Sequence, residues 1–182
     1  MKLILSKIKT YFGKLDKLLL FMCMGIAFFA VFIQYTLYEN DISSAVTASQ
    51  YKTQIIAFIA GLVIAMALAA INYKYLAKLW FIYVPLAMGL TLLLFTPLGI
   101  KREGADDIGW LDLGIMTIQP SEILKLAFIL SLAVHLSKVE DRMNEPIHFI
   151  LLCVHGAIPT LLIRQTGDDG SALVFLFIFL CM

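Results

Sequence analysis

The chain has 182 residues, of which 61% are hydrophobic and 15% charged, and its mean hydropathy is +0.90. Intrinsic disorder is excluded, because disordered chains are poor in apolar residues and rich in charge. A soluble enzyme is excluded because a chain of this length cannot bury so much apolar side chain in one core. The net charge of +1 gives no electrostatic basis for binding nucleic acid. The composition therefore predicts an all-α, polytopic integral membrane protein.

The apolar stretches of the sequence predict its transmembrane helices. A spanning helix needs about 20 apolar residues. Five stretches meet this requirement, and they cover residues 18–38, 53–71, 79–99, 120–136 and 147–163. A sixth stretch covers 170–182, which is too short to cross. We therefore expect five complete transmembrane helices and a truncated sixth, so that 18–182 would form the N-terminal part of a larger transmembrane domain.

The segment before the first span carries apolar residues at steps of three and four, with lysines between them: Leu5, Ile8, Phe12, Leu15 and Leu19. This pattern predicts an interfacial amphipathic helix over residues 1–17, with its lysines near anionic lipid.

The positions of Lys and Arg predict the orientation, because cytoplasmic loops are enriched in both residues. A cytoplasmic N-terminus puts nine of them inside: Lys2, Lys7, Lys9, Lys14, Lys17, Lys74, Lys78, Lys138 and Arg142. Four then lie outside: Lys52, Lys101, Arg102 and Arg164. We therefore expect the N-terminus in the cytoplasm.

The densest set of polar residues near a span is the run Gln119-Pro120-Ser121-Glu122-Ile123-Leu124-Lys125. Proline favours the first helical position, which makes Gln119 the cap and places Glu122 near the positive end of the helix dipole. Glu122 and Lys125 are three residues apart and share one helix face. Two interpretations stay open: a capped helix with a neutralising ion pair, or an outward-facing cation that receives an anionic head group.

Two neighbouring segments add candidate residues on the predicted outer side. Trp110 lies in the loop 100–119, either as an interfacial anchor or as part of a re-entrant segment that shapes a lipid pocket. Asp168 and Gly170 lie in a turn after the fifth span, where Asp168 is either a turn residue or part of a site.

The cysteines and histidines of the sequence do not indicate a metal site or a catalytic role. Cys23, Cys153 and Cys181 have no Cys-x-x-Cys or Cys/His spacing, so no metal site is predicted. His135 and His155 are isolated in separate spans, without acidic or histidine partners at ligand spacing. They are interpreted as packed or hydrogen-bonded structural residues, and we give neither a functional role.

The stretch from Trp110 to Ala127, WLDLGIMTIQPSEILKLA, closely resembles the signature after the third span of the SEDS family, the RodA, FtsW and SpoVE proteins of bacterial shape, division and sporulation. Residues 168–174, DDGSALV, resemble a second family signature. Many members carry an arginine where Gly109 stands, and the resemblance implies that this arginine contacts a diphosphate. In this chain Lys101, Arg102 or Lys125 would have to make that contact instead. The long motif favours a RodA-like member.

The resemblance implies a peptidoglycan glycosyltransferase that polymerises lipid II at the outer face of the bacterial plasma membrane, beside a class B penicillin-binding protein and membrane lipids. In this family the catalytic base is an aspartate between the seventh and eighth spans. We therefore assign no catalytic residue and expect this chain to be inactive alone. Substrate-binding or supporting residues would be Trp110, Gln119, Ser121, Glu122, Lys125, Asp168 and Gly170.

Alternatives remain at this stage. The chain could belong to a lipid II flippase or to a non-catalytic scaffold for the penicillin-binding protein. No cofactor is assigned, and a divalent cation stays open.

The predicted topology places Asp107 outside the membrane and Glu140 inside. Single cysteines at these positions in a cysteine-free background should show this with an impermeant thiol reagent. In intact cells we expect labelling at 107 and none at 140. Labelling at 140 from outside would contradict the orientation.

Overall fold

The computed structural model describes residues 13, 16–40, 48–102, 104, 106–114 and 117–182. It divides into two units, Met1–Asn72 and Tyr73–Met182, which we describe separately. The predicted amphipathic helix over 1–17 lies outside the described residues, apart from Gly13, Asp16 and Lys17.

The first unit contains two long helices that pack against each other, α2 (Lys17–Glu39) and α3 (Ala48–Ala70). Asp16 caps α2, because its Oδ1 accepts a hydrogen bond of 3.0 Å from the backbone N–H of Leu19. At the other end of the pair, the ring of Tyr51 lies 5.1 Å from that of Tyr38, centroid to centroid. No residue of α2 is buried, so this unit presents apolar side chains outward.

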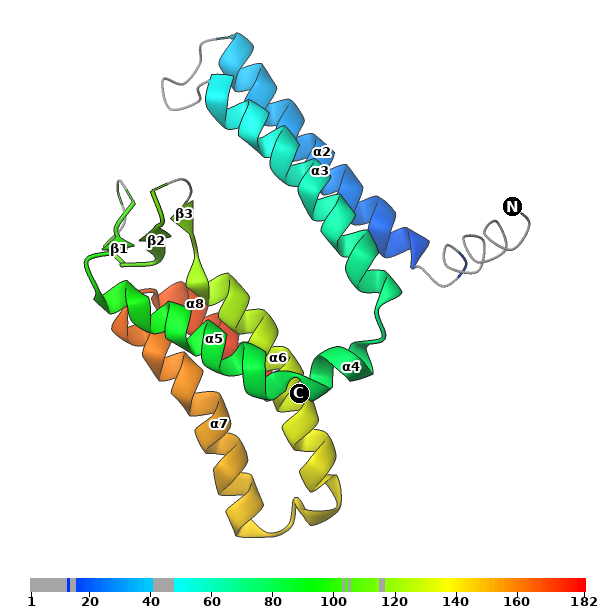
Figure 1. Cartoon of the computed structure of the whole chain (residues 1–182), viewed down its shortest axis with the longest axis vertical. Coiled ribbons are helices and arrows are strands. Elements are labelled where there is room, and N and C mark those ends of the chain that lie inside the picture. The colour runs from blue at the N-terminus through cyan, green and yellow to red at the C-terminus, as the bar shows by residue number, and fades with distance from the viewer. Residues whose placement is uncertain (1–12, 14–15, 41–47, 103, 105, 115–116) are drawn as a thin grey trace. The chain divides into compact units, whose positions relative to one another are not determined.

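The second unit is built around α6 (Pro120–Val139), which contacts α4 (Tyr73–Lys78), α5 (Trp80–Leu92), α7 (Pro146–Gln165) and α8 (Asp169–Cys181) (Figure 1). Two short 3₁₀ helices, η1 (Leu93–Phe95) and η2 (Glu140–Arg142), follow α5 and α6. Prolines stand at the first positions of α6 and α7, as expected for residues that need no intrahelical donor there. The core includes Leu124, Phe128 and Leu132 of α6 and Phe175 of α8.

The loop between α5 and α6 contains a small antiparallel sheet of order β1-β2-β3, formed by Gly99–Ile100, Trp110–Asp112 and Thr117–Ile118. Gly99 pairs with Leu111, which in turn pairs with Ile118. The all-α prediction therefore holds for the mostly helical body but missed this sheet. Strands of two or three residues are too short to show the alternating pattern that sequence analysis relies on.

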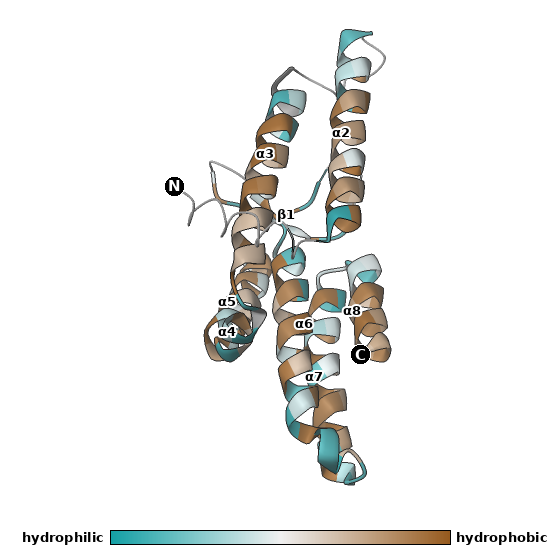
Figure 2. Cartoon of the chain, turned by 90° about the vertical axis from the view of Figure 1, so that its right-hand side faces the viewer, coloured by the Kyte–Doolittle hydropathy of each residue, from teal (hydrophilic) through white to brown (hydrophobic). Residues whose placement is uncertain are grey.

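Among the residues that the structure describes, three helices are long and apolar enough to cross a membrane: Lys17–Glu39, Tyr51–Ala70 and Pro146–Gln165. They correspond to three of the predicted spans. In Figure 2 the apolar colour covers most of each of these helices, while hydrophilic residues gather near their ends. The helix α6 is as long as α7 but carries Glu122, Lys125 and Lys138. The last helix, α8, has 13 residues.

The third predicted span, residues 79–99, differs from the observed helix. The helical part is Trp80–Phe95, and the chain then turns into β1. Pro97 explains the early end, because a proline disfavours helical geometry at the preceding residue, Thr96. The apolar run continues beyond Pro97 but follows the sheet instead of a helix.

The buried face of α8 gives a test of this packing. Phe175 is 0% exposed and its ring lies 5.5 Å from that of Phe128, whereas Phe177 on the same helix is 67% exposed. We expect Phe175→Ala to lower the free energy of unfolding in detergent by about 3–5 kcal/mol. The matched control Phe177→Ala should cost under about 1 kcal/mol. Equal losses would contradict the packing of α8 against α6.

Candidate functional site

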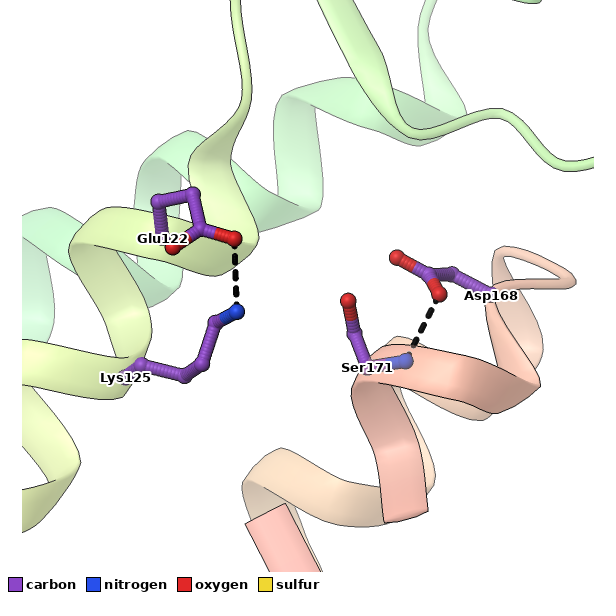
Figure 3. Close-up of polar contacts among 4 residues, drawn as sticks. All are labelled: Glu122, Lys125, Asp168 and Ser171. Atoms are coloured by element: carbon purple, nitrogen blue, oxygen red, sulfur yellow. Dashed lines mark hydrogen bonds and ion pairs between the residues drawn. The ribbon is translucent and has the colours of Figure 1, made fainter. Parts of the chain in front are cut away.

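The first turn of α6 contains the predicted ion pair. Lys125 Nζ donates a hydrogen bond of 2.6 Å to Glu122 Oε1 (Figure 3). The Lys125 side chain is 18% exposed and that of Glu122 is 60% exposed. The amide of Glu122 donates to the carbonyl oxygen of Gln119, whose own side chain makes no capping hydrogen bond. The pair is therefore electrically neutral, with its carboxylate toward solvent and its ammonium partly covered.

Ser121 is the most enclosed of the predicted site residues, at 2% exposed. Its Oγ has no hydrogen-bond partner within the part of the chain that the structure describes. A buried hydroxyl normally has a partner, because leaving it unpaired costs roughly 1–3 kcal/mol. Ser121 thus supplies a free polar atom in the first turn of α6.

The first turn of α8 lies against the same region. Asp168 Oδ1 accepts a hydrogen bond of 2.8 Å from the amide of Ser171, which makes Asp168 the N-cap. Gly170 lies within this turn. The helices α6 and α8 are in contact, and Figure 3 shows the side chains of Lys125 and Asp168 on the sides of the two helices that face each other. The structure thus brings these two predicted site residues to one region.

Trp110 lies in β2 opposite Ile100, and a cation covers its ring. The guanidinium carbon of Arg102 is 3.6 Å from the ring centroid, which is a close cation–π contact. The segment before β2 is bound to the end of α7, because the amide of Ile108 donates a hydrogen bond of 2.9 Å to the carbonyl oxygen of Thr166. The loop is thus tied to the end of α7 as well as to its own sheet.

The residue before Trp110 is Gly109, and its surroundings leave little room for a side chain. This residue is buried, and a Cβ built on it would lie 2.5 Å from Asp107 Oδ2 and 3.9 Å from Gln119 Nε2. A side chain at 109 would therefore require Asp107 to move. A guanidinium does lie next to the tryptophan, and it comes from Arg102.

The two histidines are hydrogen-bonded, as the sequence analysis favoured, but they are not isolated from each other. The Nδ1 atoms of His135 on α6 and His155 on α7 lie 3.0 Å apart, and His155 Nε2 lies 3.0 Å from Ser131 Oγ. Counting ~1.5 Å per α-helical residue and ~2.0 Å per 3₁₀ residue, both histidines lie roughly 12–14 Å from the turn that joins their helices. The distance for His135 includes the three residues of η2, which follow α6 directly.

Comparison with known proteins assigns the family. The family profile for FtsW, RodA and SpoVE, described as cell cycle protein, matches residues 14–182. The chain belongs to this family. Members of this family are multi-pass membrane proteins, and relatives of this chain are named for peptidoglycan glycosyl transfer and for rod shape.

Three individual proteins show how far the similarity extends. A Methylomonas methanica (strain DSM 25384 / MC09) protein named "Probable peptidoglycan glycosyltransferase FtsW" is 28% identical over 174 residues, which cover 92% of this chain and 44% of that protein. A chain of a peptidoglycan synthase complex, solved in a study of how polymerization and crosslinking are coordinated, matches with a TM-score of 0.68 at 24% identity, over 88% of this chain and 45% of that one. The rod shape determining protein RodA of Thermus thermophilus matches with a TM-score of 0.62 at 24% identity, over 83% and 49%. The chain thus spans about half the length of these FtsW/RodA/SpoVE relatives.

The site residues do not form a metal centre. Within the ranges that the structure describes, no group of three or more His, Cys, Asp or Glu side chains could hold a metal ion. Glu122 pairs with Lys125, and Asp168 caps α8. The structure therefore assigns no ligand set to a divalent cation.

The cap of α8 gives a direct test of the turn geometry. Asp168→Ala should destabilise the first turn by about 1 kcal/mol, because the amide of Ser171 loses its acceptor. We expect that amide to exchange with deuterium about fivefold faster in Asp168→Ala. Asp168→Asn keeps an acceptor oxygen and should exchange nearly as the wild type does.

Asp169→Ala is the control, since Asp169 is exposed and its nearest cation, Arg164, is 3.7 Å away and also exposed. Faster exchange in Asp169→Ala alone would show that Asp168 is not the cap.

Proposed function

We propose that this chain forms the N-terminal part of a peptidoglycan glycosyltransferase that polymerises lipid II at the outer face of the bacterial plasma membrane. The observation that carries the proposal is the first turn of α6. There a partly covered ammonium, a buried hydroxyl without a partner among the described residues and the positive end of a helix dipole occur within the seven residues Gln119–Lys125. The homologue named as a peptidoglycan glycosyltransferase FtsW supports this reaction class.

The chemistry of the substrate fits this turn. Glycosyl transfer from lipid II releases a polyprenyl diphosphate, so negative charge grows on the departing diphosphate in the transition state. A helix N-terminus and a lysine stabilise such charge best when they are held in place beforehand and partly shielded from water. Glu122 holds the Lys125 ammonium in position through the 2.6 Å contact. Gln119 and Ser121 would supply polar contacts beside it.

The sheet between α5 and α6 would form one wall of the entry to this site. The Arg102 guanidinium stacked on Trp110 places a second cation near the predicted outer boundary. An arginine held on an aromatic face keeps its N–H donors in one plane, which suits bidentate contact with phosphate. Asp168 and Gly170 would shape the opposite wall from α8.

No residue of this chain is assigned as the general base for the acceptor sugar. The family resemblance expects that aspartate between the seventh and eighth spans. The proposed orientation keeps the N-terminus in the cytoplasm and places the sheet outside, and a class B penicillin-binding protein would cross-link the polymer.

The proposal is tested with the protein expressed from its complete gene, purified together with its penicillin-binding partner and supplied with purified lipid II. Formation of glycan polymer supports it. Movement of lipid II across vesicles without polymer would contradict it and indicate the flippase. No effect on lipid II of either kind would indicate the scaffold.

Lys125 provides the residue-level prediction. Lys125→Met keeps the apolar stem and removes the charge, so polymer formation should fall on the order of a hundredfold, equivalent to ~3 kcal/mol of lost electrostatic stabilisation. Lys125→Arg should recover only part of the rate, because a planar guanidinium does not reproduce a compact ammonium. Glu122→Gln should cost less than Lys125→Met.

The control is Lys52→Met, which removes an exposed lysine from α3 on the same predicted side of the membrane. It should leave the rate unchanged. Near-wild-type synthesis by a well-folded Lys125→Met variant would mean that the Glu122–Lys125 pair only caps α6.

A further inference from the structure

Within the Tyr73–Met182 unit, a cavity with several polar residues in its lining lies at the end distant from the sheet. It has a volume of about 230 Å³ and lies between α5, α6 and α7, lined by Trp80, Ser131, Val134, His135, Lys138 and His155. Lys138 is 13 residues after Lys125, which at ~1.5 Å per residue puts the two lysines roughly 20 Å apart along α6. The two sites are therefore separate.

The charge of this cavity is positive and has no counter-charge. None of the six lining residues is acidic. Lys138 has no carboxylate within ion-pair distance among residues 16–40, 48–102, 104, 106–114 and 117–182. Lys125, on the same helix, is paired with Glu122. A cation at the edge of an apolar environment with no partner attracts an anionic ligand.

An aromatic ring holds the cation at the cavity. Lys138 Nζ is 5.6 Å from the centroid of Trp80, within the range of a cation–π contact. Lys138 is exposed, so its stem lies along the ring while its ammonium stays accessible at the mouth of the cavity. Tryptophan and lysine together are typical of the depth at which lipid head groups lie.

The two histidines supply hydrogen-bonding groups to the same cavity. The contact between the Nδ1 atoms needs one N–H and one lone pair. Ser131 Oγ has one proton and lies within hydrogen-bond distance of both the carbonyl oxygen of Phe128 (3.1 Å) and His155 Nε2 (3.0 Å). When that proton goes to Phe128, His155 Nε2–H donates to Ser131, His135 Nδ1–H donates to His155, and His135 Nε2 is an acceptor. When the proton goes to His155 Nε2, His155 donates through Nδ1 to His135, and the Nε2–H of His135 is a donor. An anion in the cavity would favour this arrangement, because it orders the whole chain from Ser131 to His135 toward donation.

We propose that this cavity binds the phosphodiester head group of an anionic glycerophospholipid in the leaflet opposite the sheet. Lys138 supplies the charge and His135 a hydrogen bond. The neighbouring helices carry exposed apolar side chains, including Ile82 on α5 and Leu151 on α7, which would be available to the acyl chains. Basic pockets between transmembrane helices are a recognised mode of binding such head groups. A free phosphate would make no use of these apolar side chains.

The test is native mass spectrometry of the chain released from micelles that contain phosphatidylglycerol and phosphatidylcholine with identical acyl chains. We expect the wild type to retain phosphatidylglycerol about fivefold over phosphatidylcholine, the factor that corresponds to ~1 kcal/mol for one lysine near the head groups. Lys138→Gln should bring the ratio close to one, and Lys138→Arg should preserve it. His135→Leu should lower it by about threefold.

The matched control is Arg142→Gln, which removes the same charge from the exposed η2 helix at the same end of α6 without altering the cavity lining. It should keep the wild-type ratio. Equal loss in Arg142→Gln and Lys138→Gln would overturn the proposal, because it would show a general charge effect. A wild-type ratio of one would overturn it irrespective of the variants.

Inorganic phosphate in large excess separates the two possible sources of the anion. Retention of phosphatidylglycerol in its presence supports the lipid site, whereas displacement would overturn the lipid assignment in favour of a free anion. None of these measurements uses lipid II, so their outcome is independent of the proposed glycosyltransferase function.

Discussion

The packing of the buried face of α6 positions the polar residues at both ends of this helix. Leu124, Phe128 and Leu132 lie on this face and are almost fully enclosed, and Phe128 packs on Phe175 of α8. Close packing of this kind leaves one arrangement of the surrounding helices, because interiors tolerate neither voids nor overlaps. The first turn of α6 is thereby held against α8, and its last turns against α5 and α7.

The two lysines of α6 show how the surroundings of a charge set its availability. Lys125 is partly covered and paired with a carboxylate one turn away, so its charge is compensated within the helix. Lys138 lies over Trp80 beside two histidines, with no acid in the cavity lining. The first lysine suits the stabilisation of charge that develops during a reaction. The second suits a permanent anion, because none of the residues that line its cavity carries a negative charge.

In the loop between α5 and α6, the residue before Trp110 is a glycine, and the cation beside Trp110 comes from a different segment of the loop. A side chain at 109 would meet the Asp107 carboxylate, and the cation beside Trp110 comes from Arg102 across the sheet. The pairing of β1 with β2 makes this possible, because it brings residues near Ile100 level with Trp110. The cation on the ring of Trp110 therefore comes from β1's side of the sheet and not from the residue before the tryptophan.

The sequence by itself determined the features that depend on near neighbours. Apolar runs predicted the long helices, Pro120 predicted the start of α6, and the spacing of Glu122 and Lys125 predicted their contact, because three residues make one helical turn. The tertiary structure decided the contacts between distant residues: the short strands, Arg102 on Trp110, and the meeting of His135 with His155 across 20 positions. Such contacts depend on how helices and loops pack, and packing sums many small contributions that no local pattern records.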